Sequence, residues 1–138
     1  MNRFIHAAAF SSCLAVAACG AASPSPSVPP SAPAAASLDG KSYEVNLQFP
    51  GEAPIKDVLS FDSGKFESSA CTSLGFPKWT DYRAEPNGGA IAFHVETHNP
   101  KGPSVEWDGT VAGASAAGKA KRTIEGKTDL GTFAGSAR

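Results

Sequence analysis

Apolar and polar side chains alternate along several short stretches of the chain, and this period of two constrains the fold more than any other feature. Residues 43–49 and 91–95 place an apolar or aromatic side chain at every second position, and residues 105–111 do so with one glycine in the series. Successive side chains of a strand point to opposite faces, so each stretch predicts a strand with one buried face. A single helical turn at residues 71–76 is the only helical feature that we expect in this part of the chain.

Turn-forming residues separate these stretches, as in Asp62-Ser63-Gly64 and Asn87-Gly88-Gly89. We predict eight strands, at 41–49, 56–61, 64–71, 79–85, 89–98, 104–112, 117–124 and 129–137. Short connections favour pairing between neighbours, which gives a single antiparallel meander. An all-β fold closed as a small lipocalin-like barrel is the expected result, because closure removes exposed strand edges. A two-sheet sandwich is the alternative.

The inward side of this barrel is read from the same alternation. A small barrel of this kind is either filled by its side chains or keeps a cavity for one ligand, and both outcomes are left open. The residues expected to point inward are Tyr43, Val45, Leu47, Leu59, Phe61, Phe66, Phe93, Val95, Trp107, Val111 and Phe133.

The first twenty residues have the layout of an export signal. A short positive start is followed by an apolar segment, residues 4–17, that is too short to span a bilayer. The segment ends on Val16-Ala17-Ala18-Cys19, which resembles the lipobox of bacterial lipoproteins. The resemblance implies cleavage before Cys19 and attachment of lipid chains such as palmitate to that residue. An ordinary signal peptide that happens to contain Cys19 is the alternative.

The segment after Cys19 predicts a tether. Residues 21–37 contain only alanine, serine, proline and one valine, a composition that cannot bury enough apolar surface to fold. The expected organisation is therefore a signal peptide at 1–18, a lipidated N-terminus with a disordered linker at 19–37, and a β-barrel domain at 38–138. Gly20 in place of aspartate implies the outer membrane by the sorting rule of Gram-negative lipoproteins, with the periplasmic or surface face left open.

The charge balance argues against nucleic acid as a partner. Twelve basic and thirteen acidic residues give a net charge of −1, and no basic stripe is present to bind phosphates. No cofactor motif is recognisable. The runs "DVLSFDSGKFESSAC", "IAFHVET" and "VEWDGTVAG" resemble a group of small secreted bacterial proteins of uncharacterised function with a lipocalin-like or calycin-like layout. That resemblance implies the barrel and brings no catalytic residues with it.

One strand carries side chains of the kind that bind metals. His94, Glu96 and His98 share one face of the strand expected at 89–98, and imidazole and carboxylate groups are zinc ligands. Neighbouring side chains on that face are about 7 Å apart, so all three converge only if the strand bends strongly. Glu106 or Asp108 on the next strand could complete a site. A solvated outer face is the simpler interpretation.

Cys71 is the only cysteine of the expected barrel domain, because Cys13 lies in the signal peptide and Cys19 is the expected lipid attachment site. We favour a buried free thiol, with a Cys71-linked dimer as an alternative and a nucleophile as a further one.

Four aromatic residues remain as candidates for lining a ligand site. Phe76, Trp79, Tyr82 and Trp107 could surround a ligand, although side chains of this kind equally fill a barrel core, which we favour. The expected function is that of a non-catalytic binding or structural module, monomeric and anchored to the envelope. It holds a small apolar ligand or contacts another envelope protein. A metal-binding protein or an enzyme that uses His94, Glu96 and His98 is the alternative.

Overall fold

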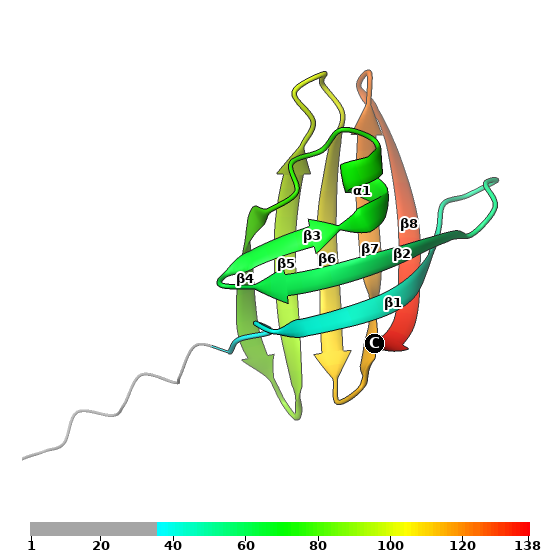
Figure 1. Ribbon diagram of the computed structural model, residues 1–138. Coiled ribbons are helices and arrows are strands. Elements are labelled where there is room, and N and C mark those ends of the chain that lie inside the picture. The colour runs from blue at the N-terminus through cyan, green and yellow to red at the C-terminus, as the bar shows by residue number, and fades with distance from the viewer. Residues whose placement is uncertain (1–35) are drawn as a thin grey trace, which may run out of the picture. The chain divides into compact units, whose positions relative to one another are not determined.

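The structure, a computed structural model, describes residues 36–138 and shows eight antiparallel strands in a closed barrel (Figure 1). Each strand pairs with the next, and β8 closes on β1 by pairing residues 132–137 with residues 43–48. The predicted meander barrel is confirmed. The expected signal peptide, Cys19 and the linker up to residue 35 lie outside the described residues. The elements are β1 Lys41–Gln48, β2 Ile55–Asp62, β3 Lys65–Ser68, α1 Ser69–Ser73, β4 Thr80–Asn87, β5 Ala90–His98, β6 Ser104–Ala112, β7 Ser115–Ile124 and β8 Lys127–Ala137.

The strand predicted at 64–71 is wrong over its last three residues, which belong to helix α1. Ser68 ends β3 with an extended backbone and caps the helix, since its Oγ accepts a hydrogen bond from the Cys71 amide at 3.1 Å. Serine side chains that form hydrogen bonds with nearby backbone groups compete with strand pairing. The alternation of apolar and polar residues over 64–71 does not indicate where such bonds form, so it does not predict the end of the strand at Ser68.

Strands β7 and β8 each begin two residues earlier than predicted. Strand β7 follows a two-residue turn, Gly113 and Ala114, in which Gly113 has a positive φ (58°). Strand β8 follows Glu125 and Gly126, both with positive φ (49° and 76°). Two such residues form the tight hairpin turn whose twist matches that of the strands, so the ladder continues almost to the turn. The longest strands of the barrel result from this hairpin.

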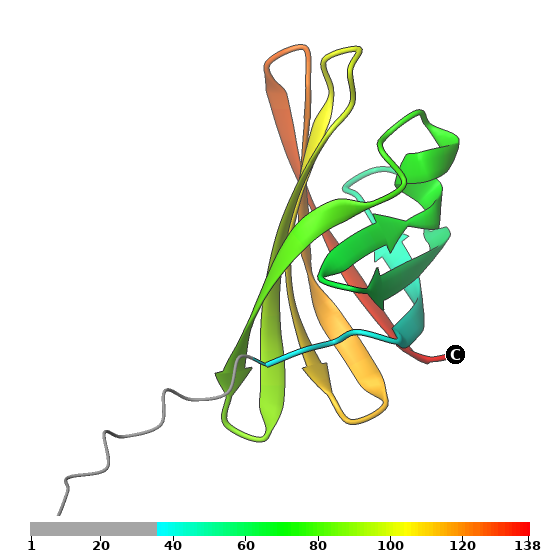
Figure 2. The same ribbon diagram turned by 60° about the vertical axis from the view of Figure 1, so that its left-hand side comes forward.

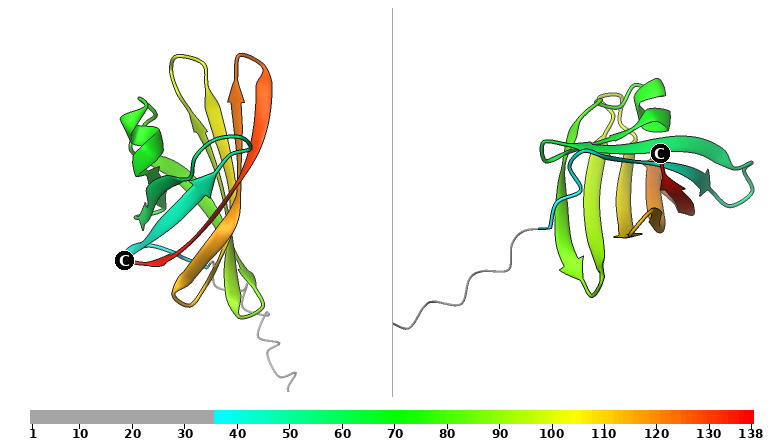
Figure 3. Two further views of the ribbon diagram at one scale, coloured as in Figure 1. Left: turned by 90° about the vertical axis from the view of Figure 1, so that its right-hand side faces the viewer. Right: turned by 60° about the horizontal axis from the view of Figure 1, so that its bottom comes forward.

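The connections divide the barrel into two ends that differ in content (Figures 1 and 2). An even number of antiparallel strands puts the β1–β2, β3–β4, β5–β6 and β7–β8 connections at one end, here called the mouth end, where α1 lies. The other three turns lie at the opposite end, here called the filled end, together with the beginning of β1 and the end of β8. Figure 3 shows β1–β3 facing the long strands β5–β8 across the interior.

The filled end contains a cluster of aromatic rings. All eleven residues expected to point inward are buried. Phe61 contacts Phe66 and Phe93 with ring centroids 5.4 and 5.0 Å apart. Trp107 extends the cluster toward the mouth end, 5.6 Å from Phe66 and 5.5 Å from Phe133. Rings in tilted and edge contact at these distances fill the interior and stabilise it beyond their buried area.

Glycines facing the interior make room for these rings. A Cβ atom on Gly109 would lie 2.5 Å from the ring of Phe93, and one on Gly118 would lie 2.7 Å from Phe133. Small residues opposite large ones let a narrow barrel accommodate several aromatic side chains without voids.

The chain enters the barrel at a fixed point on the filled end. The Tyr82 hydroxyl accepts a hydrogen bond from the Leu38 amide at 2.9 Å and donates one to Asp39 Oδ1 at 2.8 Å. Hydrogen bonds from the Gly64 amide and the Tyr82 hydroxyl lower the pKa of the Asp39 carboxyl. Leu38 is fully buried beside this network. No helix within residues 36–138 has the length and hydropathy needed to cross a bilayer.

Candidate functional site: an apolar pocket at the mouth end

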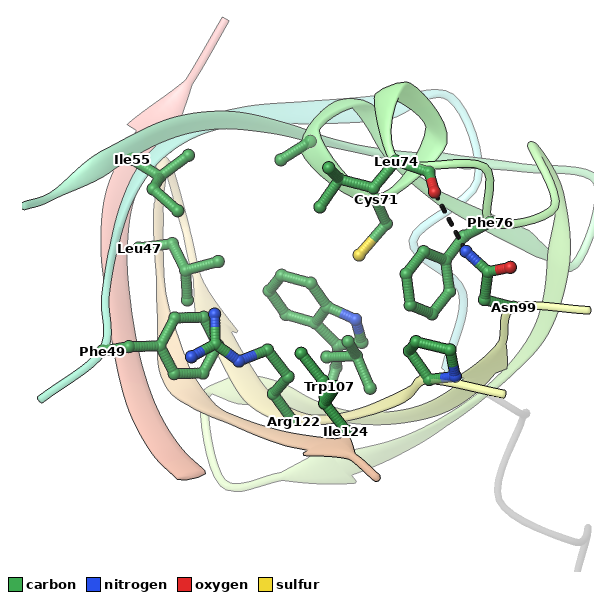
Figure 4. Close-up of a pocket in the computed structure, with 13 residues that line it drawn as sticks. Leu47, Phe49, Ile55, Cys71, Leu74, Phe76, Asn99, Trp107, Arg122 and Ile124 are labelled. Atoms are coloured by element: carbon green, nitrogen blue, oxygen red, sulfur yellow. Dashed lines mark hydrogen bonds between the residues drawn. The ribbon is translucent and has the colours of Figure 1, made fainter. Parts of the chain in front are cut away.

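The mouth end of the barrel contains a pocket of about 280 Å³ (Figure 4). Its floor is the indole of Trp107, and its rim carries three exposed apolar side chains, those of Ile55, Leu74 and Ile124. The interior is therefore filled at one end and hollow at the other. The pocket is lined by Leu47, Phe49, Ile55, Ala70, Cys71, Leu74, Phe76, Asn99, Pro103, Val105, Trp107, Arg122 and Ile124.

A buried carboxylate fixes the helix that forms one wall of the pocket. Asp57 is 1% exposed and accepts hydrogen bonds from Ser68 Oγ at 2.6 Å, Ser69 Oγ at 2.9 Å and the Ala70 amide at 2.9 Å. The amide of Ala70 is one of the unpaired donors of the first helical turn, so the carboxylate both caps α1 and joins it to β2. Burial of this charge is tolerated because three donors surround it.

The far end of the helix is held by the β5–β6 connection. Asn99 is buried, and its Nδ2 donates to the Leu74 carbonyl at 2.9 Å (Figure 4). Its Oδ1 accepts from the Lys101 amide at 2.9 Å, which shapes the connection itself. The helix is thus fixed to two separate parts of the barrel, and the wall that it forms is preorganised.

Arg122 closes the opposite side of the pocket. Its guanidinium lies 4.0 Å from the centroid of the Phe49 ring and binds Glu52 through both terminal nitrogens, at 3.2 and 2.5 Å. Asp129 accepts a further bond from Nη2 at 3.1 Å. The bond from Arg122 lowers the pKa of Glu52 and raises that of Arg122 itself. These contacts hold the β1–β2 connection against β7 and β8.

The thiol of Cys71 points into the pocket above the indole (Figure 4). Burial raises its pKa to about 11, the hydrogen bond with Ser68 opposes that shift, and the charge of Asp57 adds to it. The thiol is protonated at neutral pH, whereas a nucleophilic cysteine requires a lowered pKa. The buried position favours the free thiol of our sequence interpretation over a disulfide between two chains.

This shift predicts a loss of stability at alkaline pH. Below pH 9 the thiol is protonated in both states, so its contribution is fully present. Between pH 9 and 11 only the unfolded chain releases the proton, and stability falls by about 2–3 kcal/mol. Urea denaturation at pH 8 and pH 11 measures the drop, and in Cys71→Ala the drop should be smaller by that amount. An equal drop in both proteins would contradict the assignment.

The four aromatic candidates separate into two groups. Phe76 and Trp107 line the pocket. Tyr82 packs on Phe61 at 5.1 Å between ring centroids and bonds to Asp39, so it belongs to the filled end. Trp79 is 41% exposed and lies under the Lys78 ammonium, 5.9 Å from its ring centroid. Only two of the four candidates therefore meet at one site.

On the histidine-bearing face of β5, the structure groups His94 with Glu106 and Asp108, the two residues of the next strand that could complete a metal site, rather than with Glu96 and His98. His94 Nδ1 lies 2.7 Å from Asp108 Oδ1 on β6, whereas His98 Nε2 lies 3.1 Å from Glu96 Oε1. Within residues 36–138 the one group of three whose ligand atoms approach within 4.8 Å is His94, Glu106 and Asp108, across two strands. Glu106 already binds the Lys121 ammonium, which raises the pKa of Lys121. The face is a network of paired polar and charged side chains, and an ion would have to displace these contacts.

Among the pocket residues that sequence reasoning did not identify as site residues, two have polar side chains, Arg122 and Asn99. Arg122 adjoins Lys119 and Lys121, which look like a solvated cluster, yet it is out of phase with both and therefore faces the other side of β7. The position of Arg122, an odd number of residues from both lysines, therefore indicates a charged side chain that faces the barrel interior. Asn99 follows β5 directly, and nothing in its neighbours indicates a bond to a segment 25 residues away.

Comparison with known proteins assigns no relative to this barrel. No family model matches the chain, and neither a curated protein nor a solved structure matches it.

Proposed function

We propose that this protein is an envelope lipoprotein whose barrel binds one small apolar molecule in the mouth-end pocket, without catalysing a reaction on it. The observation that carries the proposal is the apolar pocket of about 280 Å³ above Trp107. Small-molecule sites are concave, mostly apolar and largely preformed, and this pocket has all three properties. A dry cavity of roughly 150 Å³ accepts benzene, so this one suits a ligand of on the order of ten to fifteen non-hydrogen atoms.

The chemistry of the lining supports binding rather than catalysis. Neither histidine nor a carboxylate lines the pocket, and the guanidinium of Arg122 is held by Glu52 and Asp129. A covalent mechanism needs a nucleophile with a base beside it, and the Cys71 thiol is protonated and has Ser68 as its hydrogen-bonding neighbour. The lining therefore provides apolar contact area for a ligand and side chains that orient it, without groups that would react with it.

The pocket is tested with n-propylbenzene as a neutral apolar probe. In a ¹H–¹⁵N NMR titration of the purified protein, we expect saturable shifts at pocket residues such as Ala70 and Asn99. Ala70→Phe places a ring in the pocket and should weaken binding at least tenfold. Ala114→Phe is the matched control, since Ala114 is exposed in the β6–β7 turn at the filled end. No saturable binding, or equal binding by both variants, would refute the proposal.

The anchor rests on the lipobox resemblance at Val16–Cys19, which lies outside the described residues. Two or more acyl chains give stable membrane attachment, whereas one chain gives marginal attachment. Cells labelled with radioactive palmitate should incorporate label into the wild-type protein and none into Cys19→Ser. Cys71→Ser is the control and should label as the wild type does. Label retained in Cys19→Ser would contradict the anchor.

A further inference from the structure

Two residues that line the pocket carry buried hydrogen-bond donors that nothing in the protein satisfies. Within residues 36–138, two buried side-chain polar atoms have no partner, Trp107 Nε1 and Arg122 Nε. Both residues line this pocket. Buried polar groups are nearly always paired, and an exception calls for an explanation. Two exceptions at one pocket point to a bound group that accepts hydrogen bonds.

The other polar groups of the lining do not offer a free acceptor. Asn99 uses its Nδ2 on the Leu74 carbonyl and its Oδ1 on the Lys101 amide. Figure 4 places the indole in the middle of the lining side chains, with its nitrogen on the side of Phe76 and Asn99. An unpartnered N–H donor, closed off from solvent, therefore lies at the pocket wall within an apolar surround.

The charges at this end disfavour an anionic ligand. Arg122 is the one charged residue of the lining, and two carboxylates, those of Glu52 and Asp129, already bind it. No positive charge remains to compensate a ligand carboxylate. Burial of an uncompensated carboxylate is very costly, whereas a neutral acceptor loses only its bond to water and regains one from the indole.

We propose that the ligand is a small neutral molecule with an apolar body and a carbonyl group, such as a ketone, ester or aldehyde, that accepts a hydrogen bond from Trp107 Nε1. The inference rests on the proposed function and specifies the chemistry of the molecule that the same pocket binds. The apolar body occupies the space beneath Ile55, Leu74 and Ile124. The carbonyl satisfies the buried indole N–H.

Three probes of similar size test this chemistry: n-propylbenzene, propiophenone, which adds the carbonyl, and 3-phenylpropanoate, which adds a negative charge. Affinities come from NMR titrations of the purified protein. We expect propiophenone to bind the wild type at least about tenfold more tightly than 3-phenylpropanoate. Tighter binding of 3-phenylpropanoate would overturn the proposal without any variant being needed.

Trp107→Phe removes the N–H and keeps an aromatic floor. It should weaken binding of propiophenone about tenfold more than binding of n-propylbenzene, because only propiophenone loses a hydrogen bond. Retained binding of n-propylbenzene also shows that the variant is folded. Unchanged binding of propiophenone, or equal weakening of both probes, would overturn the carbonyl assignment while leaving the pocket intact. Failure of n-propylbenzene to bind the wild type would instead refute the proposed function.

Discussion

Asp57→Ala is expected to lower the free energy of unfolding by about 3 kcal/mol and to weaken binding of n-propylbenzene at the mouth-end pocket. The carboxylate is buried and accepts from Ser68, Ser69 and the Ala70 amide. Its removal leaves these donors without a partner, and each bond to a charged group contributes roughly 1.5–3 kcal/mol without simple additivity. The helix then loses its attachment to β2, and with it the pocket loses the wall that carries Ala70 and Cys71.

Urea denaturation measures the first effect and the propylbenzene titration the second. Asp62→Ala is the matched control, because Asp62 is an exposed aspartate on the same strand and should change stability by less than about 0.5 kcal/mol. The role of Asp57 would be contradicted by stability and binding that match those of Asp62→Ala.

Gly135→Ala should be comparably damaging, although it adds only a methyl group. A Cβ atom at this position would overlap the Glu44 carbonyl oxygen and lie 2.6 Å from Val45 Cα. Both neighbours are backbone atoms of β1, so no side chain can rotate away. Overpacking of this kind costs about 1–3 kcal/mol, and we expect the upper end of that range. Because β8 closes the barrel on β1 at this point, amide hydrogen exchange along residues 43–48 should also accelerate.

Gly89→Ala provides the comparison. A Cβ atom there meets nothing within 4 Å, and the residue has no positive φ. Its free energy of unfolding should stay within about 0.5 kcal/mol of the wild type. If both alanine variants had the same free energy of unfolding, the close approach of β8 to β1 would not require glycine at position 135.

The strands and the core could be predicted from the sequence because alternation is a local property. The side chains of Tyr43 and Phe93 point inward in any sheet that buries their face, so their burial followed without knowledge of the closure. Closure itself followed from short connections between neighbours and from the cost of exposed edges.

The pocket could not be predicted in the same way, since it depends on contacts between segments far apart in the chain. Helix α1 replaces the end of a predicted strand because Asp57, eleven residues before Ser68, receives the bonds of its first turn. The grouping of the candidate metal ligands depends on register in a related way: register places Asp108 opposite His94, so His94 lies with Glu106 and Asp108 of the next strand rather than with Glu96. Alternation specifies a face and contains no information on register.

The division of the barrel into a filled and a mouth end has a consequence for how such a protein can change. The rings of Phe61, Phe66 and Phe93 stabilise the fold far from the connections that shape the pocket. Loop length and rim side chains can therefore diverge, by evolution or by design, without loss of the core. Trp107 is the exception, because it packs on Phe66 and Phe133 and also forms the pocket floor. Variants with new ligand preferences should accordingly accumulate around this tryptophan and seldom at it.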